Sequence, residues 1–189
     1  MIKIGIIGDI GSGKSYVAKR FGYPVFNADV EVGKLYKKNR KIFNKLRKKL
    51  PKYIYSFPIN KDEICEAILE NKTNLKKIVD IVHLEIRKKM NLFLKKNINK
   101  KIVILDIPLF LENKINDKKD ILVYVQSKKS SILKRLKKRK NFNQKLLKKF
   151  KAIQYPASYK KKKSNFVIKN NFTKKSINDG INNILKEII

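Results

Sequence analysis

The 189-residue sequence has few of the residues that mark disulfide-rich, zinc-binding or membrane proteins. A single cysteine, Cys65, excludes an internal disulfide and is typical of a reducing compartment. With only one histidine as well, no cluster of Cys and His ligands can hold a metal ion. Even the apolar segment at residues 102–111 is interrupted by Asp106 and is too short to span a membrane. The chain opens on an expected strand, so we expect no signal peptide, no membrane association and a cytoplasmic location.

Acidic residues are also scarce, with 15 Asp and Glu against 48 Lys and Arg and a formal charge of +33. Such a charge is typical of nucleic-acid-binding proteins. However, lysine, asparagine and isoleucine share A/T-rich codons, so a mutational bias accounts for this composition without a partner. The lysines are also spread along the chain rather than gathered in one stripe, which favours a solvated surface. We therefore expect weak attraction to polyanions at low salt and no dedicated nucleic-acid partner.

The segment GDIGSGKS at residues 8–15 matches the phosphate-binding loop pattern G-x-x-x-x-G-K-[S/T]. A β-branched run precedes it and an expected helix follows it, which is the strand–loop–helix order that the motif needs. Glycines allow the backbone N–H groups to close around a polyphosphate. Lys14 is expected to reach the β- and γ-phosphates of a bound nucleotide, and the Ser15 hydroxyl to hold Mg²⁺. The residues expected to bind the nucleotide here are Gly8, Gly11, Ser12, Gly13, Lys14, Ser15 and Tyr16.

Strands and helices alternate along the sequence, which predicts a mostly parallel sheet with helices on both faces. Strands are expected at residues 2–7, 24–26, 102–105, 121–125 and 166–168. Helices are expected at residues 15–21, 30–50, 62–69, 73–96, 128–138, 144–153 and 176–188. Between them lie a basic, turn-like segment at residues 139–143 and a local run of lysines at residues 160–163.

This order predicts an α/β fold of the P-loop, nucleoside-monophosphate-kinase-like class. Its five-stranded parallel sheet is flanked by helices and carries a helical substrate insertion and a lid. We expect one domain over residues 1–189. Within it, residues 1–29, 101–127 and 164–189 form the nucleotide-binding core, residues 30–100 the acceptor-binding insertion, and residues 128–163 the lid with its flanking helices.

Five segments, taken in order, match the motifs of one enzyme family. They are GDIGSGKS at 8–15, NAD at 27–29, HLEIR at 83–87, DIPLFLE at 106–112, and the stretch from QYP at 154–156 to FVIKNN at 166–171. Together they resemble the dephospho-coenzyme A kinases nearly end to end. The resemblance implies ATP and Mg²⁺ as cofactors and dephospho-coenzyme A as substrate, phosphorylated on its ribose 3′-hydroxyl in the final step of coenzyme A biosynthesis. The oligomeric state stays open.

The resemblance assigns several residues to the acceptor. Asp29 follows the second expected strand, at the edge where open α/β sheets bind ligands, and a carboxylate suits the acceptance of the hydroxyl proton. Its alternative role is a helix N-cap. His83 and Arg87 share one helix face, and the resemblance places both at the acceptor site. A guanidinium suits phosphate recognition, whereas a lone histidine is equally typical of a packed core. Pro108 is expected to shape the acceptor crevice.

Three further residues are expected around ATP and its metal ion. Asp106 ends the third expected strand, where it either holds Mg²⁺ through water or closes a turn. Arg139, in the basic connection that resembles the family's lid, is expected to neutralise charge on the transferring phosphoryl group. Arg135 is expected to assist Arg139 or to take its place. The alternative for both arginines is that they belong to a solvated run of charged residues without a role in catalysis. By the resemblance alone, Asn170 lies near the adenine.

The chain also departs from the family pattern. Asp9 stands in place of the second loop glycine and adds a negative charge close to bound phosphate. Tyr16 replaces a threonine, and Asn27 replaces the first aspartate of the family's D-A-D. Three more departures are Leu84, Asn165 and Lys169. None of these changes removes the loop lysine, the metal-binding serine, the proposed catalytic aspartate or the lid arginine, so we expect activity to be retained.

Two other functions stay open on the sequence alone. Another small-molecule kinase, such as a nucleoside monophosphate kinase, would phosphorylate a phosphate rather than a sugar hydroxyl, and Asp29 argues against it. A basic RNA-binding P-loop protein without kinase activity would instead show salt-sensitive affinity for RNA.

Overall fold

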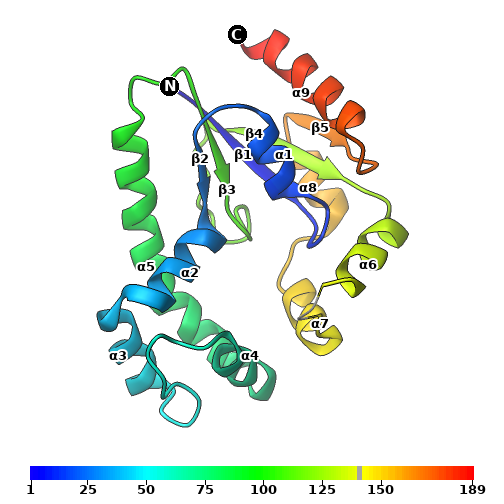
Figure 1. Cartoon of the computed structure of the whole chain (residues 1–189). Coiled ribbons are helices and arrows are strands. Elements are labelled where there is room, and N and C mark those ends of the chain that lie inside the picture. The colour runs from blue at the N-terminus through cyan, green and yellow to red at the C-terminus, as the bar shows by residue number, and fades with distance from the viewer. Residues whose placement is uncertain (140–141) are drawn as a thin grey trace. The chain divides into compact units, whose positions relative to one another are not determined.

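The computed structural model describes residues 1–139 and 142–189 (Figure 1). Positions 140 and 141, which belong to the basic connection expected at residues 139–143, lie outside the described residues. The chain divides into two compact units. The first comprises Met1–Asn27, Asn97–Phe142 and Ile153–Ile189, and the second comprises Ala28–Lys96 and Asn143–Ala152. None of the helices in the described part of the chain has both the length and the apolar character that crossing a membrane requires.

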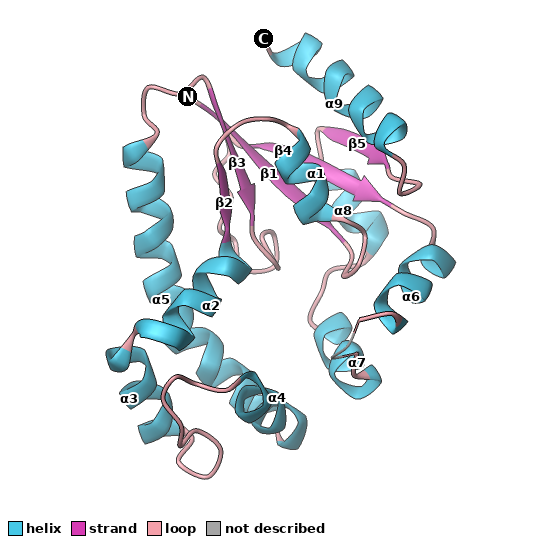
Figure 2. Cartoon of the chain, viewed as in Figure 1, coloured by secondary structure: helices cyan, strands magenta, loops and turns pink. Residues whose placement is uncertain are grey.

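The first unit is built on a parallel sheet with the strand order β2-β3-β1-β4-β5 (Figure 2). Its strands are β1 (Ile2–Gly8), β2 (Val25–Asn27), β3 (Ile102–Asp106), β4 (Ile121–Gln126) and β5 (Phe166–Lys169). This confirms the predicted five-stranded parallel sheet. Every residue of β3 is buried, as its continuous apolar sequence predicts. Because the strands are parallel, their carboxyl ends share one edge, and Gly8, Asn27 and Asp106 each end a strand there.

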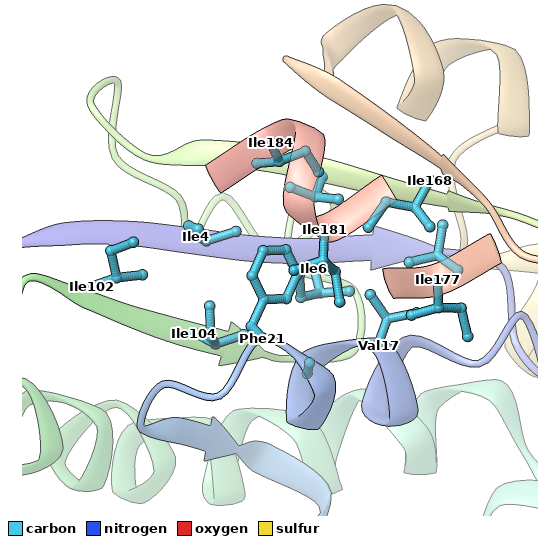
Figure 3. Close-up of a cluster of buried hydrophobic side chains, with 13 residues drawn as sticks. Ile4, Ile6, Val17, Phe21, Ile102, Ile104, Ile168, Ile177, Ile181 and Ile184 are labelled. Atoms are coloured by element: carbon cyan, nitrogen blue, oxygen red, sulfur yellow. The ribbon is translucent and has the colours of Figure 1, made fainter. Parts of the chain in front are cut away.

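The helices of this unit are α1 (Lys14–Arg20), α6 (Lys129–Lys137), α8 (Ala157–Lys163) and α9 (Lys174–Ile188). Helices α1 and α9 contact each other and the sheet. Their apolar side chains form one core with those of the central strands (Figure 3). Alternation along β1 directs Ile4 and Ile6 into this core. The core anchors α1, so it also holds the end of the phosphate-binding loop that leads into this helix.

The second unit consists of α2 (Ala28–Lys38), α3 (Arg40–Lys49), α4 (Lys61–Glu70), α5 (Lys72–Lys96) and α7 (Gln144–Ala152). The long helix α5 contacts α2, α3 and α4, and α7 contacts α4. Ile78, Val82 and Ile86 of α5 are buried at helical spacing, as the sequence periodicity predicts.

Two segments differ from the helices expected from the sequence. The single helix expected over residues 30–50 is divided at Asn39, whose side chain accepts a hydrogen bond from the Ile42 N–H at 3.0 Å and caps α3. The lysine run at residues 160–163 lies within α8, which begins directly after Pro156. Its first lysine, Lys160, is buried rather than solvated.

Helix α4 ends without a basic residue in its last turn, and Lys149 of α7 supplies one. The Lys149 ammonium donates to the backbone oxygens of Ile68 at 2.9 Å and Leu69 at 2.7 Å. A cation at a helix C-terminus pairs with orphan carbonyls and with the helix dipole. Replacing Lys149 by Met is therefore expected to lower the free energy of unfolding by about 1 kcal/mol in urea denaturation. Lys148→Met removes an exposed lysine of the same helix and serves as the control, with no such loss expected.

Candidate active site

The phosphate-binding loop runs from the end of β1 to the start of α1 and depends on glycine geometry. Gly13, the residue before α1, has a φ of 94°, and Gly11 has a φ of 85°. Residues other than glycine rarely adopt such φ angles. A Cβ atom at Gly13 would also lie 2.5 Å from Nδ2 of Asn170. The two glycines are therefore required both by the backbone and by the space around it.

Two side chains from other elements hold the loop in place. The Ser12 carbonyl accepts hydrogen bonds from Nδ2 of Asn170 at 2.8 Å and from Oγ of Ser127 at 3.0 Å. Asn170 and Ser127 follow the neighbouring strands β5 and β4, respectively. The structure thus brings Asn170 to the loop through a contact with the loop backbone, and its place near the adenine stays a prediction. Ser127 was not predicted from the sequence as a site residue, although its position directly after a buried strand could have indicated it.

Lys14 is folded over the loop itself. Its ammonium donates to the backbone oxygens of Gly8 at 3.1 Å and Asp9 at 3.0 Å. The positive charge is therefore held at the mouth of the loop, where a polyphosphate would lie.

Asp106 is the buried centre of a polar cluster in the predicted site. It is 3% exposed and accepts a hydrogen bond from Nδ2 of Asn27 at 2.5 Å. Burial raises the pKa of its carboxyl group, and a hydrogen bond from Ser15 and the charge of Lys14 oppose that rise. Asp106 and Ser15, both predicted metal-site residues, are thus brought together. The sequence had marked Asn27 only as a departure from the family pattern.

These groups fit Mg²⁺. A carboxylate and a hydroxyl are the hard oxygen ligands that the ion prefers, and it usually takes only one or two protein ligands beside substrate phosphates. The described residues contain no group of three or more His, Cys, Asp or Glu that could hold a metal ion.

A cavity of about 460 Å³ lies at Ser127 and Asn170, the two residues that bind the loop backbone. It is lined by Gln126, Ser127, Lys128, Ser131, Lys169, Asn170 and Asn171. Near this region the Arg135 guanidinium lies 4.4 Å from the centre of the Phe172 ring. Arg139 and Tyr16 are exposed, and so is Pro108. These three therefore present their side chains to solvent in the first unit.

Three of the four predicted acceptor residues, Asp29, His83 and Arg87, belong to the second unit. Asp29 is exposed in the first turn of α2, where a carboxylate interacts favourably with the helix dipole. On α5, Arg87 is exposed and His83 is half-buried. Burial and the nearby charge of Arg87 lower the pKa of His83, and Asp80 opposes this shift.

His83 is the only histidine, so its titration can be followed without ambiguity by NMR. We expect a pKa below 6.5, and therefore a neutral imidazole at pH 7. Because the folded pKa is depressed, the fold loses stability as the pH falls from 6.5 through the folded value. Arg87→Leu is expected to raise the pKa of His83 part of the way, and Asp80→Asn to lower it further. A pKa of 6.5 or higher in the wild type would contradict this account.

Comparison with known proteins settles the family. A family model described as dephospho-CoA kinase matches residues 2–176. The chain belongs to the dephospho-CoA kinase family. The dephospho-CoA kinase of Wolbachia sp. subsp. Brugia malayi (strain TRS) is 30% identical over 190 residues, which cover 98% of this chain and 97% of that relative.

Solved structures agree on the fold. A Thermus thermophilus protein matches with a TM-score of 0.78 at 22% identity, covering 100% of this chain and 98% of its own. Dephospho-CoA kinase from Campylobacter jejuni matches with a TM-score of 0.58 at 22% identity, covering 98% and 96%. The P-loop kinase fold predicted from the sequence is thereby confirmed.

Membership of the dephospho-CoA kinase family also confirms the predicted enzyme class. The chain is a kinase that transfers phosphate to a hydroxyl group, in the final step of coenzyme A biosynthesis. The family implies ATP as the phosphate donor. Neither a nucleoside monophosphate kinase nor an RNA-binding protein without kinase activity is favoured.

Proposed function

We propose that this dephospho-CoA kinase moves the γ-phosphoryl group of ATP directly to the ribose 3′-hydroxyl of dephospho-coenzyme A, through the residues described above. The observation that carries the proposal is the cluster at the strand ends, where Ser15 and Asn27 hydrogen-bond to the buried Asp106 beside the loop lysine. A P-loop kinase needs a hydroxyl and a carboxylate at this place to position the metal ion of its nucleotide.

The loop is proposed to bind the donor. Its N–H groups and Lys14 would hold the β- and γ-phosphates, with Lys14 exchanging its bonds to the Gly8 and Asp9 carbonyls for phosphate oxygens. The cavity beside Asn170 would take the adenosine, because its volume and the amide and hydroxyl groups among its lining residues suit a nucleoside.

Ser15 and Asp106 would hold Mg²⁺, Ser15 directly and Asp106 through water. When bound, the ion supplies charge that offsets the negative charge of the phosphates. Asp106 must be ionised for this task, and the hydrogen bonds from Ser15 and Asn27 favour its ionised form against the effect of burial.

The helical insertion at residues 30–100 is proposed to bind dephospho-coenzyme A. Asp29 would accept the proton of the 3′-hydroxyl as the oxygen attacks the γ-phosphorus, and ADP leaves as the terminal P–O bond breaks. The Arg87 guanidinium would bind phosphate of the acceptor. The neutral His83 would donate or accept one hydrogen bond, and Pro108 would border the acceptor.

The lid, which lies with its flanking helices at residues 128–163, is proposed to close over the nucleotide. Arg139 would then neutralise charge that develops on the transferring phosphoryl group, and Arg135 would assist it. No covalent intermediate with the enzyme is needed, because a single in-line displacement balances the reaction.

A coupled assay of ADP release tests the proposal, with dephospho-coenzyme A, adenosine and nucleoside monophosphates as acceptors and Mg²⁺ supplied or chelated. We expect turnover with dephospho-coenzyme A alone, dependence on Mg²⁺, and a product phosphorylated at the 3′ position. Turnover of a nucleoside monophosphate at a higher kcat/KM than dephospho-coenzyme A would overturn the substrate assignment.

A further inference from the structure

An ion pair that the proposed mechanism does not use connects the phosphate-binding loop to α8. The ammonium of Lys160, on α8, donates to the carboxylate of Asp9, with 2.6 Å between Nζ and Oδ1. The Lys160 side chain is 2% exposed, whereas Lys161, the next residue of the helix, is exposed. A buried ammonium group is tolerated when an anion pairs with it. Asp9 supplies that anion.

Asp9 also belongs to the part of the loop that would face phosphate. Its backbone oxygen accepts hydrogen bonds from Lys14 Nζ at 3.0 Å and from the Ser12 N–H at 3.1 Å. Gly8, Lys14 and Lys160 line one small cavity at this point. Two ammonium groups and one carboxylate therefore gather where a polyphosphate would bind.

The negative charge of Asp9 is unfavourable for the binding of phosphate at this loop. An unpaired carboxylate within a few ångströms of a polyphosphate repels it, and the repulsion grows where water is partly excluded. Pairing with a buried cation removes most of this repulsion and also fixes the direction of the carboxylate. Asp9, which stands where the family has glycine, is thus paired with the positive charge of Lys160.

We propose that Lys160 is a positioning residue of the phosphate-binding loop, which cancels the charge of Asp9 and holds its carboxylate so that the loop accepts ATP. The inference rests on the proposed binding of ATP at this loop. It makes Asp9 and Lys160 a matched pair: the effect of losing the cation depends on the presence of the anion.

A comparison of the single and double variants tests this dependence, with the dissociation constant of Mg²⁺-ATP measured by calorimetry. Lys160→Met keeps the length of the side chain and leaves the Asp9 carboxylate unpaired, so we expect affinity to fall by about tenfold or more. Lys160→Met combined with Asp9→Asn removes both charges, and we expect affinity within about threefold of the wild type. Lys161→Met is the control for loss of a lysine from α8 and is expected to bind as the wild type does. Lys160→Arg keeps the charge and is expected to bind nearly as well.

Rescue by the second substitution separates this role from others. If the double variant binds as weakly as Lys160→Met, then Lys160 contacts phosphate or only supports the fold, and the proposal is overturned. Unchanged affinity in Lys160→Met overturns it as well. If Lys160→Met fails to fold, the double variant decides, since wild-type affinity supports the matched pair and weak affinity overturns it. A wild-type protein that binds no ATP would instead overturn the proposed function.

Discussion

An Asp29→Asn enzyme is expected to lose about 10³-fold in kcat while its affinity for ATP stays unchanged. Asparagine has nearly the same shape as aspartate but cannot take the proton of the 3′-hydroxyl. Asp29 lies in the first turn of α2, outside the loop and outside the core, so the substitution leaves the residues that would hold ATP in place. Stopped-flow or coupled kinetics with dephospho-coenzyme A measure kcat, and calorimetry with a non-hydrolysable ATP analogue measures donor affinity.

Glu31→Gln is the matched control for this experiment. Glu31 belongs to the same helical turn and pairs with Lys34 at 2.6 Å and Lys89 at 3.2 Å. Its loss removes a carboxylate and some helix stability but is expected to leave kcat nearly unchanged. Near wild-type turnover in Asp29→Asn would show that the carboxylate is not the proton acceptor. Equal losses in both variants would indicate a structural effect of the helix.

The sequence was sufficient for the features that depend on local pattern. The glycines, lysine and serine of the loop follow from its spacing, and the buried strands follow from continuous apolar runs such as Ile102 to Leu105. The placement of Asp106 also follows, because parallel strands bring their carboxyl ends to one edge of the sheet. These predictions need no knowledge of which side chains meet across the fold.

The features that could not be predicted depend on contacts between distant segments. Lys160 reads as one of four consecutive lysines, and only its contact with Asp9, 151 positions earlier, makes it a buried residue. From the sequence, Asn27 is only a position where the family's carboxylate is missing, and its role becomes clear from its hydrogen bond to Asp106. The break at Asn39 was accessible in principle, because asparagine is a strong N-cap residue. The sequence pattern nevertheless predicts a single helix, because the amphipathic run continues on either side of Asn39.

The second large effect is expected from Asp106→Asn, which should reduce turnover by about 100-fold at ordinary Mg²⁺ concentrations. Asparagine keeps an oxygen that can accept the hydrogen bond from Asn27, but it lacks the charge that would help to hold the metal ion. Part of the loss should therefore be recovered at high Mg²⁺. Titration of kcat against Mg²⁺ is the measurement, and a Mg²⁺ dependence identical to that of the wild type would contradict the assigned role.

Stability distinguishes this loss from simple damage to the fold. Burial raises the pKa of Asp106, so its ionised form costs stability, and this cost appears as the pH rises from 3.8 through the folded value. Asp106→Asn should accordingly unfold at the same temperature as the wild type or higher. Asp120→Asn is the contrasting control, because Asp120 is also buried but pairs with Lys3 at 2.9 Å, at the opposite ends of the strands. It is expected to lower the unfolding temperature and to leave the Mg²⁺ dependence unchanged.

The pH profile gives an independent check on the same carboxylate. If ionised Asp106 is the active form, activity falls on the acid side as the pH drops through the pKa of Asp106, which is raised from the ordinary value of an aspartate. Asn27→Leu removes a hydrogen bond that lowers this pKa, so the acid limb should move to higher pH. An acid limb that stays in place in Asn27→Leu would mean that a group other than Asp106 controls it. A shift in the expected direction would tie the departure at Asn27 to the working pH range of the enzyme.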